Sequence, residues 1–435
     1  MKQAIVLSGG GTKGAYELGV WRLLNELRIS YDIVTGTSIG SINGALMAMK
    51  DYERCEQMWE NLTMEDMMVD GITLANSVTD TMEDFYNQKQ ALRPYLKKYL
   101  KNKGLDNSPF KTFVEKQIDE ERVRASSINF GLVTVQFPSL TPLLLSKEKI
   151  PEGLLKDYII ASSSVFPAFP MHKIGDQTYV DGCYYDNLPI DLAVNMGARD
   201  IIAVDLHTTP QHPNHFRRPY VKTIMPTQDL GGVLDFDKQR IQKNIRLGYM
   251  DAQKAYGKLK GFTYYFTPES VSAMEKEAGK FCYAVATGEA LMMRNGKSKL
   301  EKAGDVYRIF HLFEQYANNR ALTKEDYFVR GAEICGDIFE MDPTRLYDLR
   351  ELAKELHDRI GPEDQYPDRR LFETDNQRNE IKRLSELKME NSSVYLTGCI
   401  YHAMRSKTLD LEKQMNILVY LPHEVAAVLF LQSLE

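Results

Sequence analysis

Two short apolar runs near the start of the chain each end in a cluster of glycines, and this pattern restricts the fold more than any other feature. Residues 3–7 are apolar and partly β-branched, which predicts a buried strand that stops before Gly9. Residues 14–28 and 38–50 carry apolar side chains at helical spacing, and residues 31–35 predict a second strand. This alternation predicts a mostly parallel sheet with helices outside it, which is the α/β class.

The first glycine cluster, Gly9-Gly10-Gly11-Thr12-Lys13-Gly14, joins the first strand to the first helix. Glycines allow backbone N–H groups to face a guest molecule, and the start of the following helix favours negative charge. The spacing Gly9-x-Gly11-x-x-Gly14 also fits the dinucleotide-binding fingerprint. That fingerprint needs an acidic residue near the end of the second strand, whereas Asp32 stands at its beginning. A phosphate-binding P-loop does not fit either, because Lys13 is followed by Gly14.

The second cluster, Gly36-Thr37-Ser38-Ile39-Gly40, lies where the second strand meets the second helix. A serine between glycines at such a junction is typical of a nucleophile elbow. The pattern alone is equally compatible with Ser38 as an ordinary helix N-cap. Both glycine clusters follow parallel strands, so we expect them at the same edge of the sheet, where ligands bind in open α/β folds. One loop then supplies an oxyanion hole and the other a nucleophile.

A catalytic serine needs a base, and the sequence offers two candidates. None of the eight histidines lies in a recognisable motif, and His207, after a predicted strand, is the best of them. Asp181 ends the short strand predicted at Tyr179-Val180, and Gly182 then permits a turn. An Asp-Gly pair is also typical of an ordinary Asx turn. The residues alone leave the base undecided.

Four blocks in this order resemble the patatin-like phospholipases, in the bacterial form with an additional helical C-terminal region. The resemblance covers about residues 4–205 and extends weakly to 268. The blocks are residues 9–14, residues 36–40, Ala161-Ser162-Ser163-Ser164-Val165-Phe166-Pro167 and Asp181-Gly182-Cys183, followed by Asp186-Asn187-Leu188-Pro189. Cys183 departs from the small residue usual in the family.

The resemblance implies a three-layer α/β/α fold and a carboxylic ester hydrolase that acts on acyl esters of glycerolipids. Ser38 is then the nucleophile and Asp181 its base, in a dyad without histidine. The resemblance also implies an oxyanion hole formed by the backbone N–H groups of Gly9, Gly10 and Gly11. The supporting positions are Lys13, Gly14, Gly36, Gly40 and Gly182. Two alternatives stay open: a dinucleotide-binding oxidoreductase and a non-catalytic scaffold with the same fold.

Residues 51–125 interrupt the alternation and predict a helical insertion. Their Met-rich composition, with Trp59, suits either an ordinary core or a lid and acyl-chain pocket. Further strands are predicted at residues 128–137, 141–146, 179–180, 201–206, 221–225 and 262–267.

After Pro268 the sequence predicts helices only, and Asp342-Pro343 is typical of a helix start. We therefore expect a catalytic domain over residues 1–270 and an all-helical domain over residues 271–435.

The composition of the chain limits the classes of partner that it can bind. The net charge of -6 argues against a nucleic-acid partner, and five dispersed cysteines indicate reduced thiols in a cytoplasmic protein. No apolar stretch approaches the roughly 18 residues of a membrane span, so we expect only transient, peripheral contact with the membrane surface. No cofactor or metal is expected, and the predicted partner is a phospholipid or another acyl-glycerolipid. The oligomeric state stays open, with a homodimer as one option.

Overall fold

The chain divides into two compact units, Met1–Ala255 and Tyr256–Glu435, in a computed structural model. The sequence predicted the division near residue 270. The second compact unit starts at Tyr256, and Tyr264 and Phe266 are fully buried in its core, while the functional division near residue 270 stays a prediction. The structure describes residues 1–67, 108–166, 168–207, 218–295, 312–313, 321–367, 386–406, 417 and 421–435.

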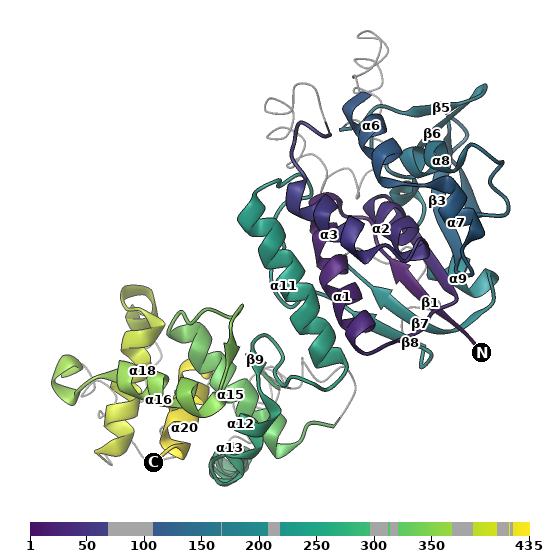
Figure 1. Cartoon of the computed structure of the whole chain (residues 1–435). Coiled ribbons are helices and arrows are strands. Elements are labelled where there is room, and N and C mark those ends of the chain that lie inside the picture. Colours follow the sequence, from purple (N-terminus) through teal and green to yellow (C-terminus); the bar gives the residue numbers. More distant parts are fainter. Residues whose placement is uncertain are drawn as a thin grey trace. The chain divides into compact units, whose positions relative to one another are not determined.

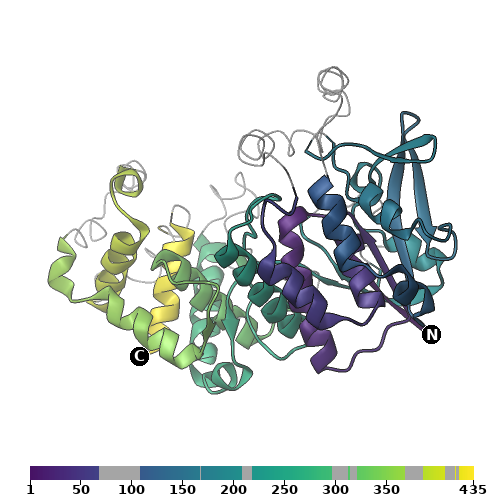
Figure 2. The same ribbon diagram turned by 45° about the horizontal axis from the view of Figure 1, so that its top comes forward.

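A mixed sheet of eight strands forms the centre of the first unit. The strands are β1 (Lys2–Leu7), β2 (Ile33–Thr37), β3 (Asn129–Phe137), β4 (Thr141–Ser146), β5 (His172–Ile174), β6 (Gln177–Asp181), β7 (Ala198–Val204) and β8 (Val221–Ile224). Their order is β5-β6-β3-β2-β1-β7-β8, and β4 pairs with β3 outside this path. Strands β3, β2, β1, β7 and β8 pair in parallel, each with the next in this order. Strands β4 and β6 pair antiparallel with β3, and β5 pairs antiparallel with β6. The β5–β6 hairpin forms one edge of the sheet and stands at the rim of the first unit in Figure 1, and Figure 2 gives a second view of the chain.

Helices cover both faces of this sheet (Figure 1). They include α1 (Ala15–Glu26), α2 (Ile39–Ala48), α8 (Leu155–Ser162), α9 (Ile190–Asn195) and α11 (Lys238–Ala255). Ala4 and Val6 of β1 pack in one cluster with Ile190 of α9, whereas Leu7 faces Gly44 of α2 on the other side. Successive strand residues point to opposite faces, so β1 is apolar on both. The predicted α/β/α arrangement is confirmed.

The insertion between β2 and β3 is helical wherever the structure describes it. It contains α3 (Tyr52–Asn61), α6 (Ser108–Gln117) and α7 (Glu120–Ala125). Asp51 and Asp119 begin two of these helices, because each carboxylate accepts a bond from a backbone N–H three residues on. The part of the predicted insertion between residues 68 and 107 lies outside the described residues.

The second unit is a helical body with its own core. Its described helices are α12 (Pro268–Ser272), α13 (Glu275–Asn295), α15 (Lys324–Ile338), α16 (Leu349–Ile360), α18 (Ser393–Arg405) and α20 (Pro422–Ser433). Most residues of α20 are buried, and α20 packs against α13, α15 and α18. A helix that is apolar on all sides belongs in a core, which explains the composition of this segment.

Two predictions for the second unit were wrong in detail. The region is not all-helical, because β9 (Tyr265–Phe266) pairs in parallel with β10 (Leu346–Tyr347) in a small separate sheet. Asp342 does not start a helix: its carboxylate instead accepts the backbone N–H of Thr344 at 2.9 Å and closes a turn. The next helix begins at Leu349, with Asp348 as its N-cap.

Candidate active site

Ser38 occupies a sharp turn between β2 and α2. Its backbone has φ 55° and ψ -128°, a conformation that non-glycine residues rarely adopt. Its side chain makes no capping bond to α2, so Ser38 is not an ordinary N-cap. A Cβ on Gly36 would lie 2.1 Å from the carbonyl oxygen of Gly40, so the turn closes only with glycine at position 36. This is the strand-to-helix geometry expected of a nucleophile elbow.

Strand β3 brings Ser38 and Asp181 together. Thr37, the last residue of β2, pairs with Val133 of β3. Asp181, the last residue of β6, pairs with the next residue, Thr134, but β6 runs in the opposite direction. The two strands therefore approach each other end to end along one edge of β3. Ser38 and Asp181 lie where they meet.

The turn after α8 connects these two residues through consecutive serines. The hydroxyl of Ser162 accepts the backbone N–H of Ser38 at 3.1 Å. The carbonyl of Ser164 accepts the backbone N–H of Asp181 at 3.0 Å. Residues 162–164 belong to the block that the sequence singled out, and they hold the backbone at both Ser38 and Asp181. Pro167, the last residue of that block, lies outside the described residues.

The carboxyl group of Asp181 is completely buried. Its Oδ1 accepts the backbone N–H of Cys183 at 2.8 Å, and its Oδ2 has no hydrogen-bond partner among the described residues. Burial raises the pKa of Asp181 to about 6, while the Cys183 N–H and the nearby Ser38 hydroxyl oppose that rise. Asp181 thus forms the Asx-type contact of an ordinary turn and also presents a free oxygen beside Ser38.

The glycine-rich loop after β1 lies next to Ser38. Strand β1 has β2 on one side and β7 on the other, so its end is a switch point of the sheet, the usual ligand position in such folds. Gly10 and Gly11 line the pocket that contains Ser38, and no hydrogen bond engages their N–H groups within the described residues. Gly9 differs, because its N–H donates to the carbonyl of Asn187 at 3.0 Å and it does not line the pocket.

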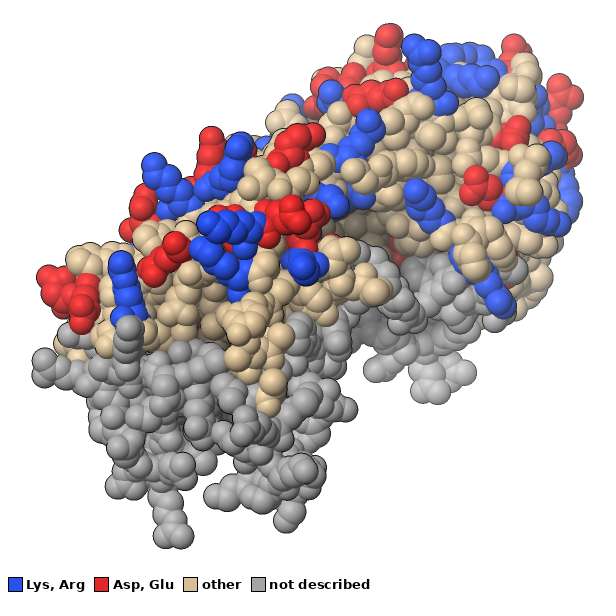
Figure 3. Space-filling view, turned by 90° about the horizontal axis from the view of Figure 1, so that it is seen from below, with Lys and Arg blue, Asp and Glu red and all other residues tan. Residues whose placement is uncertain are grey.

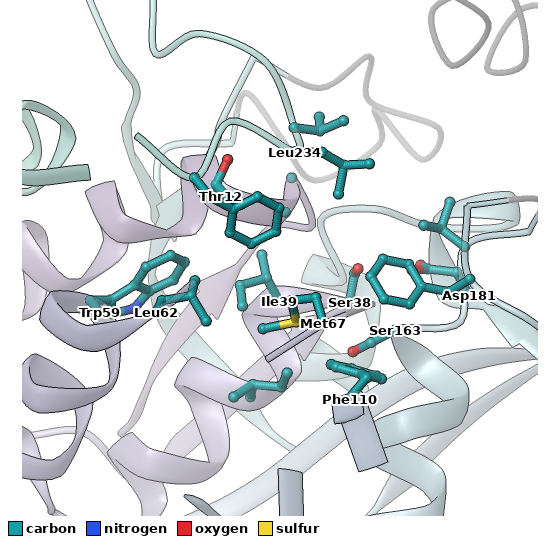
Figure 4. A pocket seen from close by; sticks show the side chains of 17 residues that line it. Thr12, Ser38, Ile39, Trp59, Leu62, Met67, Phe110, Ser163, Asp181 and Leu234 are labelled. Carbon is teal, nitrogen blue, oxygen red and sulfur yellow. The ribbon is translucent and has the colours of Figure 1, made fainter. Parts of the chain in front are cut away.

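The pocket is apolar apart from a few hydroxyls and one carboxyl. It encloses about 650 Å³ of empty space, part of it open to solvent. Figure 4 shows Ser38, Ser163 and Asp181 at one end and Trp59 and Leu62 at the other. All of its lining residues belong to the first unit: Gly10, Gly11, Thr12, Ser38, Ile39, Ile42, Trp59, Leu62, Met67, Phe110, Ser163, Val165, Phe169, Asp181, Val233, Leu234 and Phe236.

A buried network holds the far wall of this pocket. The indole N–H of Trp59 donates to Asn43 Oδ1 at 3.1 Å, and the Asn43 amide donates to Glu17 at 2.8 Å and to the carbonyl of Gly14 at 3.0 Å. Glu17 is fully buried, and this burial raises the pKa of its carboxyl well above the usual value. The network connects the pocket wall to the end of the glycine-rich loop.

Two features of the site were absent from the sequence prediction. Asn187 binds the glycine loop twice, because its side-chain amide also donates to the carbonyl of Gly9 at 3.1 Å. The segment with Val233, Leu234 and Phe236 lies across the loop, and the carbonyl of Val233 accepts the N–H of Thr12 at 2.9 Å. Asn187 stood in the block noted after Asp181, whereas no periodicity or motif marked residues 233–236.

The other predicted residues lie as follows. Lys13 and Gly14 belong to η1 (Gly11–Gly14), Gly40 lies in α2, and Gly182 begins η2 (Gly182–Tyr184). His207 bonds through Nε2 to the carbonyl of Pro226 at 2.7 Å and does not line the pocket. No histidine lines this pocket within the part of the chain that the structure describes.

On the described part of the face shown in Figure 3, Lys and Arg side chains lie among Asp and Glu side chains. Recognition of a nucleic acid needs a surface patch that is basic throughout. Among the described helices, none combines the length and the apolar character needed to cross a bilayer.

Comparisons with known proteins relate most of the first unit to one family. A model of the family "Patatin-like phospholipase" matches residues 5–194. Mouse patatin-like phospholipase domain-containing protein 7 is 30% identical over 212 residues, which are 47% of this chain and 13% of that protein. Lysophospholipase NTE1 of Mycosarcoma maydis is 28% identical over 207 residues, or 47% of this chain and 10% of that protein. The chain thus matches only a small part of these relatives.

Among solved structures, VipD from Legionella pneumophila matches 98% of this chain and 91% of its own, with a TM-score of 0.39 and 12% identity. The match to the family model covers residues 9–14, residues 36–40, the serines at positions 162–164 and Asp181. By this match, residues 5–194 are similar to patatin-like phospholipase domains, and an additional C-terminal region follows them.

Proposed function

We propose that the first unit is a serine acyl hydrolase that cleaves lipid esters, with Ser38 as nucleophile and Asp181 as its base. The observation that carries this proposal is the meeting of the two residues at one end of an apolar pocket. Ser38 lies in an elbow, and the pKa of the buried Asp181 is raised to about 6, much closer to neutral pH than that of an exposed carboxylate.

The proposed reaction has two halves. In the first, Asp181 accepts the proton of the Ser38 hydroxyl, Oγ bonds to the ester carbonyl carbon, and the bond to the alkoxy oxygen breaks. Asp181 returns the proton to that oxygen, and the alcohol leaves an acyl group on Ser38. In the second half, Asp181 takes a proton from water, the hydroxide attacks the acyl carbon, and Ser38 regains its proton as the fatty acid departs.

The oxyanion donors are assigned to the N–H groups of Gly10 and Gly11. The sequence resemblance included Gly9, but the Gly9 N–H already donates to Asn187. The other two glycines line the pocket, and their N–H groups are available to a negatively charged oxygen. Lys13 and the glycines at positions 14, 36, 40 and 182 keep the two loops in place.

The apolar pocket suits the acyl chain of a phospholipid or another acyl-glycerolipid. The family match and the lysophospholipase among the relatives support this substrate class. Such substrates reside in bilayers, so the proposal includes transient contact with a membrane surface by a cytoplasmic protein. The bacterial type of the domain, a homodimer and the division into residues 1–270 and 271–435 stay predictions.

The test is labelling with a fluorophosphonate probe, together with hydrolysis of a lysophospholipid. We expect the unaltered protein to react, Ser38→Ala to lose both signals, and Asp181→Asn to lose at least about a hundredfold in turnover. Ser139→Ala, at an exposed serine of the β3–β4 hairpin, is the matched control. Persistent labelling of Ser38→Ala would refute the proposal.

The same assay separates the alternatives. A loss of turnover in His207→Ala equal to that of Ser38→Ala would favour a triad through His207. Thermal stabilisation by a dinucleotide, with activity that does not depend on Ser38, would favour the oxidoreductase. An intact fold that neither reacts with the probe nor cleaves lipid would favour a scaffold.

A further inference from the structure

Ser163 lies in the pocket and has no role in the mechanism above. It is 7% exposed and lines the pocket, where Figure 4 shows it below Ser38. Its hydroxyl has no hydrogen-bond partner among the described residues. The hydroxyls on either side are satisfied, because Ser162 accepts the Ser38 N–H and Ser164 donates to the carbonyl of Ile160 at 2.8 Å. Ser163 is therefore the unsatisfied member of a run of three buried serines.

The position of Ser163 between its neighbours brings it close to the reacting atoms. Ser162 is bonded to the backbone of Ser38, and Ser164 is bonded to the backbone of Asp181. Consecutive Cα atoms are about 3.8 Å apart, so Ser163 stands between these two attachments. A buried hydroxyl without a partner is unfavourable, and in this position a polar atom of a bound ligand can satisfy it.

The arrangement around Ser38 indicates which atom of a bound ester the Ser163 hydroxyl can reach. The glycine loop lies on one side of Ser38, where a Cβ on Gly9 would be 3.0 Å from the Ser38 Cβ, and this side receives the carbonyl oxygen. Residues 162–164 and Asp181 lie together beside Ser38, because Ser162 is bonded to the backbone of Ser38 and Ser164 to the backbone of Asp181. Because Asp181 must return a proton to the leaving oxygen, that oxygen lies on the side of Asp181 and Ser163.

We propose that the Ser163 hydroxyl donates a hydrogen bond to the alkoxy oxygen of the scissile ester and so promotes the departure of a poor leaving group. This inference rests on the proposed function. Negative charge develops on the alkoxy oxygen as its bond to carbon breaks, and a positioned donor stabilises that charge. Ser163 thereby favours esters of aliphatic alcohols such as glycerol. A nitrophenolate is stable without such a donor and gains little.

The test compares two esters of one fatty acid, a glyceryl ester and a p-nitrophenyl ester, by kcat/KM, which reports the acylation half in both cases. In Ser163→Ala we expect a fall on the order of ten- to a hundredfold for the glyceryl ester and less than about twofold for the p-nitrophenyl ester. Ser163→Thr retains the hydroxyl and should recover the glyceryl activity. Ser164→Ala, which removes a hydroxyl that is already satisfied within the same turn, should not change the ratio of the two rates.

Equal falls for both esters in Ser163→Ala, or no fall, would overturn the inference while the proposed function stands. If the unaltered protein neither reacts with a fluorophosphonate nor cleaves either ester, both proposals fail together. Should Ser163→Ala not fold, Ser163→Cys supplies the same comparison, because a thiol has similar volume and is a weak donor. The expected result is then the same selective loss for the glyceryl ester.

Discussion

At the scale of single residues, the proposed catalytic role of Asp181 comes with a cost in stability. Its carboxyl group is buried, and the described groups that oppose the rise of its pKa are Cys183 and the nearby Ser38 hydroxyl. Neither is a cation, so the charged form has little electrostatic compensation. The same burial that makes Asp181 a stronger base therefore disfavours the folded state whenever Asp181 is ionised.

The pH dependence of hydrolysis follows from this pKa. If Asp181 is the base, as proposed, its ionised carboxylate is the active form, and kcat/KM should rise through a midpoint of about pH 6 and then stay level as the pH increases. A profile of kcat/KM from pH 4 to 9 with a p-nitrophenyl ester measures this directly. A midpoint below pH 4.5 would mean that Asp181 is not the titrating base.

The free energy of unfolding should show the opposite trend. The pKa of Asp181 in the folded protein lies above its value in the unfolded chain, so its contribution to stability is present at low pH and is lost as the pH rises through about 6. We expect Asp181→Asn to be more stable than the unaltered protein at pH 8, by on the order of 3 kcal/mol, and to gain less than about 1 kcal/mol at pH 4. Urea unfolding at the two pH values tests this, with Asp176→Asn in the exposed β5–β6 turn as control.

At the scale of elements, two facing glycines determine how α1 packs on α11. A Cβ on Gly19 of α1 would lie 1.9 Å from the carbonyl oxygen of Ile245, and a Cβ on Gly248 of α11 would lie 2.0 Å from that of Tyr16. These backbones approach so closely that a methyl group on either helix would push the other away. The hydroxyl of Tyr16 also donates to Asp251 at 3.1 Å. The contact supports the glycine loop, which leads into α1.

Alanine at either glycine should therefore destabilise the first unit. We expect Gly19→Ala and Gly248→Ala each to lower the free energy of unfolding by about 1–3 kcal/mol, because overpacking outweighs the better helix propensity of alanine. Gly279→Ala in α13 is the matched control: a Cβ there meets nothing within 4 Å, and stability should rise by up to about 1 kcal/mol. Equal effects at all three positions in thermal unfolding would contradict the packing argument.

The sequence predicted elements well where a pattern was long and local. The β1-α1-β2-α2 unit and the β3–β4 hairpin were confirmed, because apolar periodicity and glycine clusters mark them within a few residues. The strands β5 and β10 were missed, since three residues and two residues carry no periodicity. Asp342 was misassigned because the same residue type caps helices and closes turns.

In the site, too, the features marked by neighbouring residues could be predicted, and those that depend on long-range contacts could not. The elbow at Ser38 follows from neighbouring glycines, and Asp181 was identified through the order of family blocks. That the N–H of Gly9 is engaged, and that Val233 lies against the glycine loop, depends on contacts between residues far apart in the chain. A single sequence contains no signal for such contacts.

At the scale of the whole molecule, the chain contains two units that each bury their own core. Every residue that lines the pocket belongs to the first unit. The second unit surrounds α20, which would expose a large apolar surface if the other helices were absent. Each unit therefore meets the requirement for independent folding.

We expect residues 1–255 to fold and to cleave a p-nitrophenyl ester within about tenfold of the rate of the full chain. Residues 256–435 should form a cooperative helical unit without activity. Circular dichroism, thermal unfolding and the ester assay on both fragments check these outcomes. An inactive but folded fragment 1–255 would show that the chemistry needs the second unit.

The end-to-end meeting of β2 and β6 has a consequence for the time at which activity arises. Ser38 and the Ser162 hydroxyl that accepts its N–H are 124 residues apart, and Asp181 follows later still. At a synthesis rate of roughly 5–20 residues per second, the ribosome delivers the second group roughly 6–25 s after the first. Until Asp181 follows as well, the nascent chain carries a serine without its proposed base, so the proposed lipase is inert towards membranes until most of the first unit has been translated.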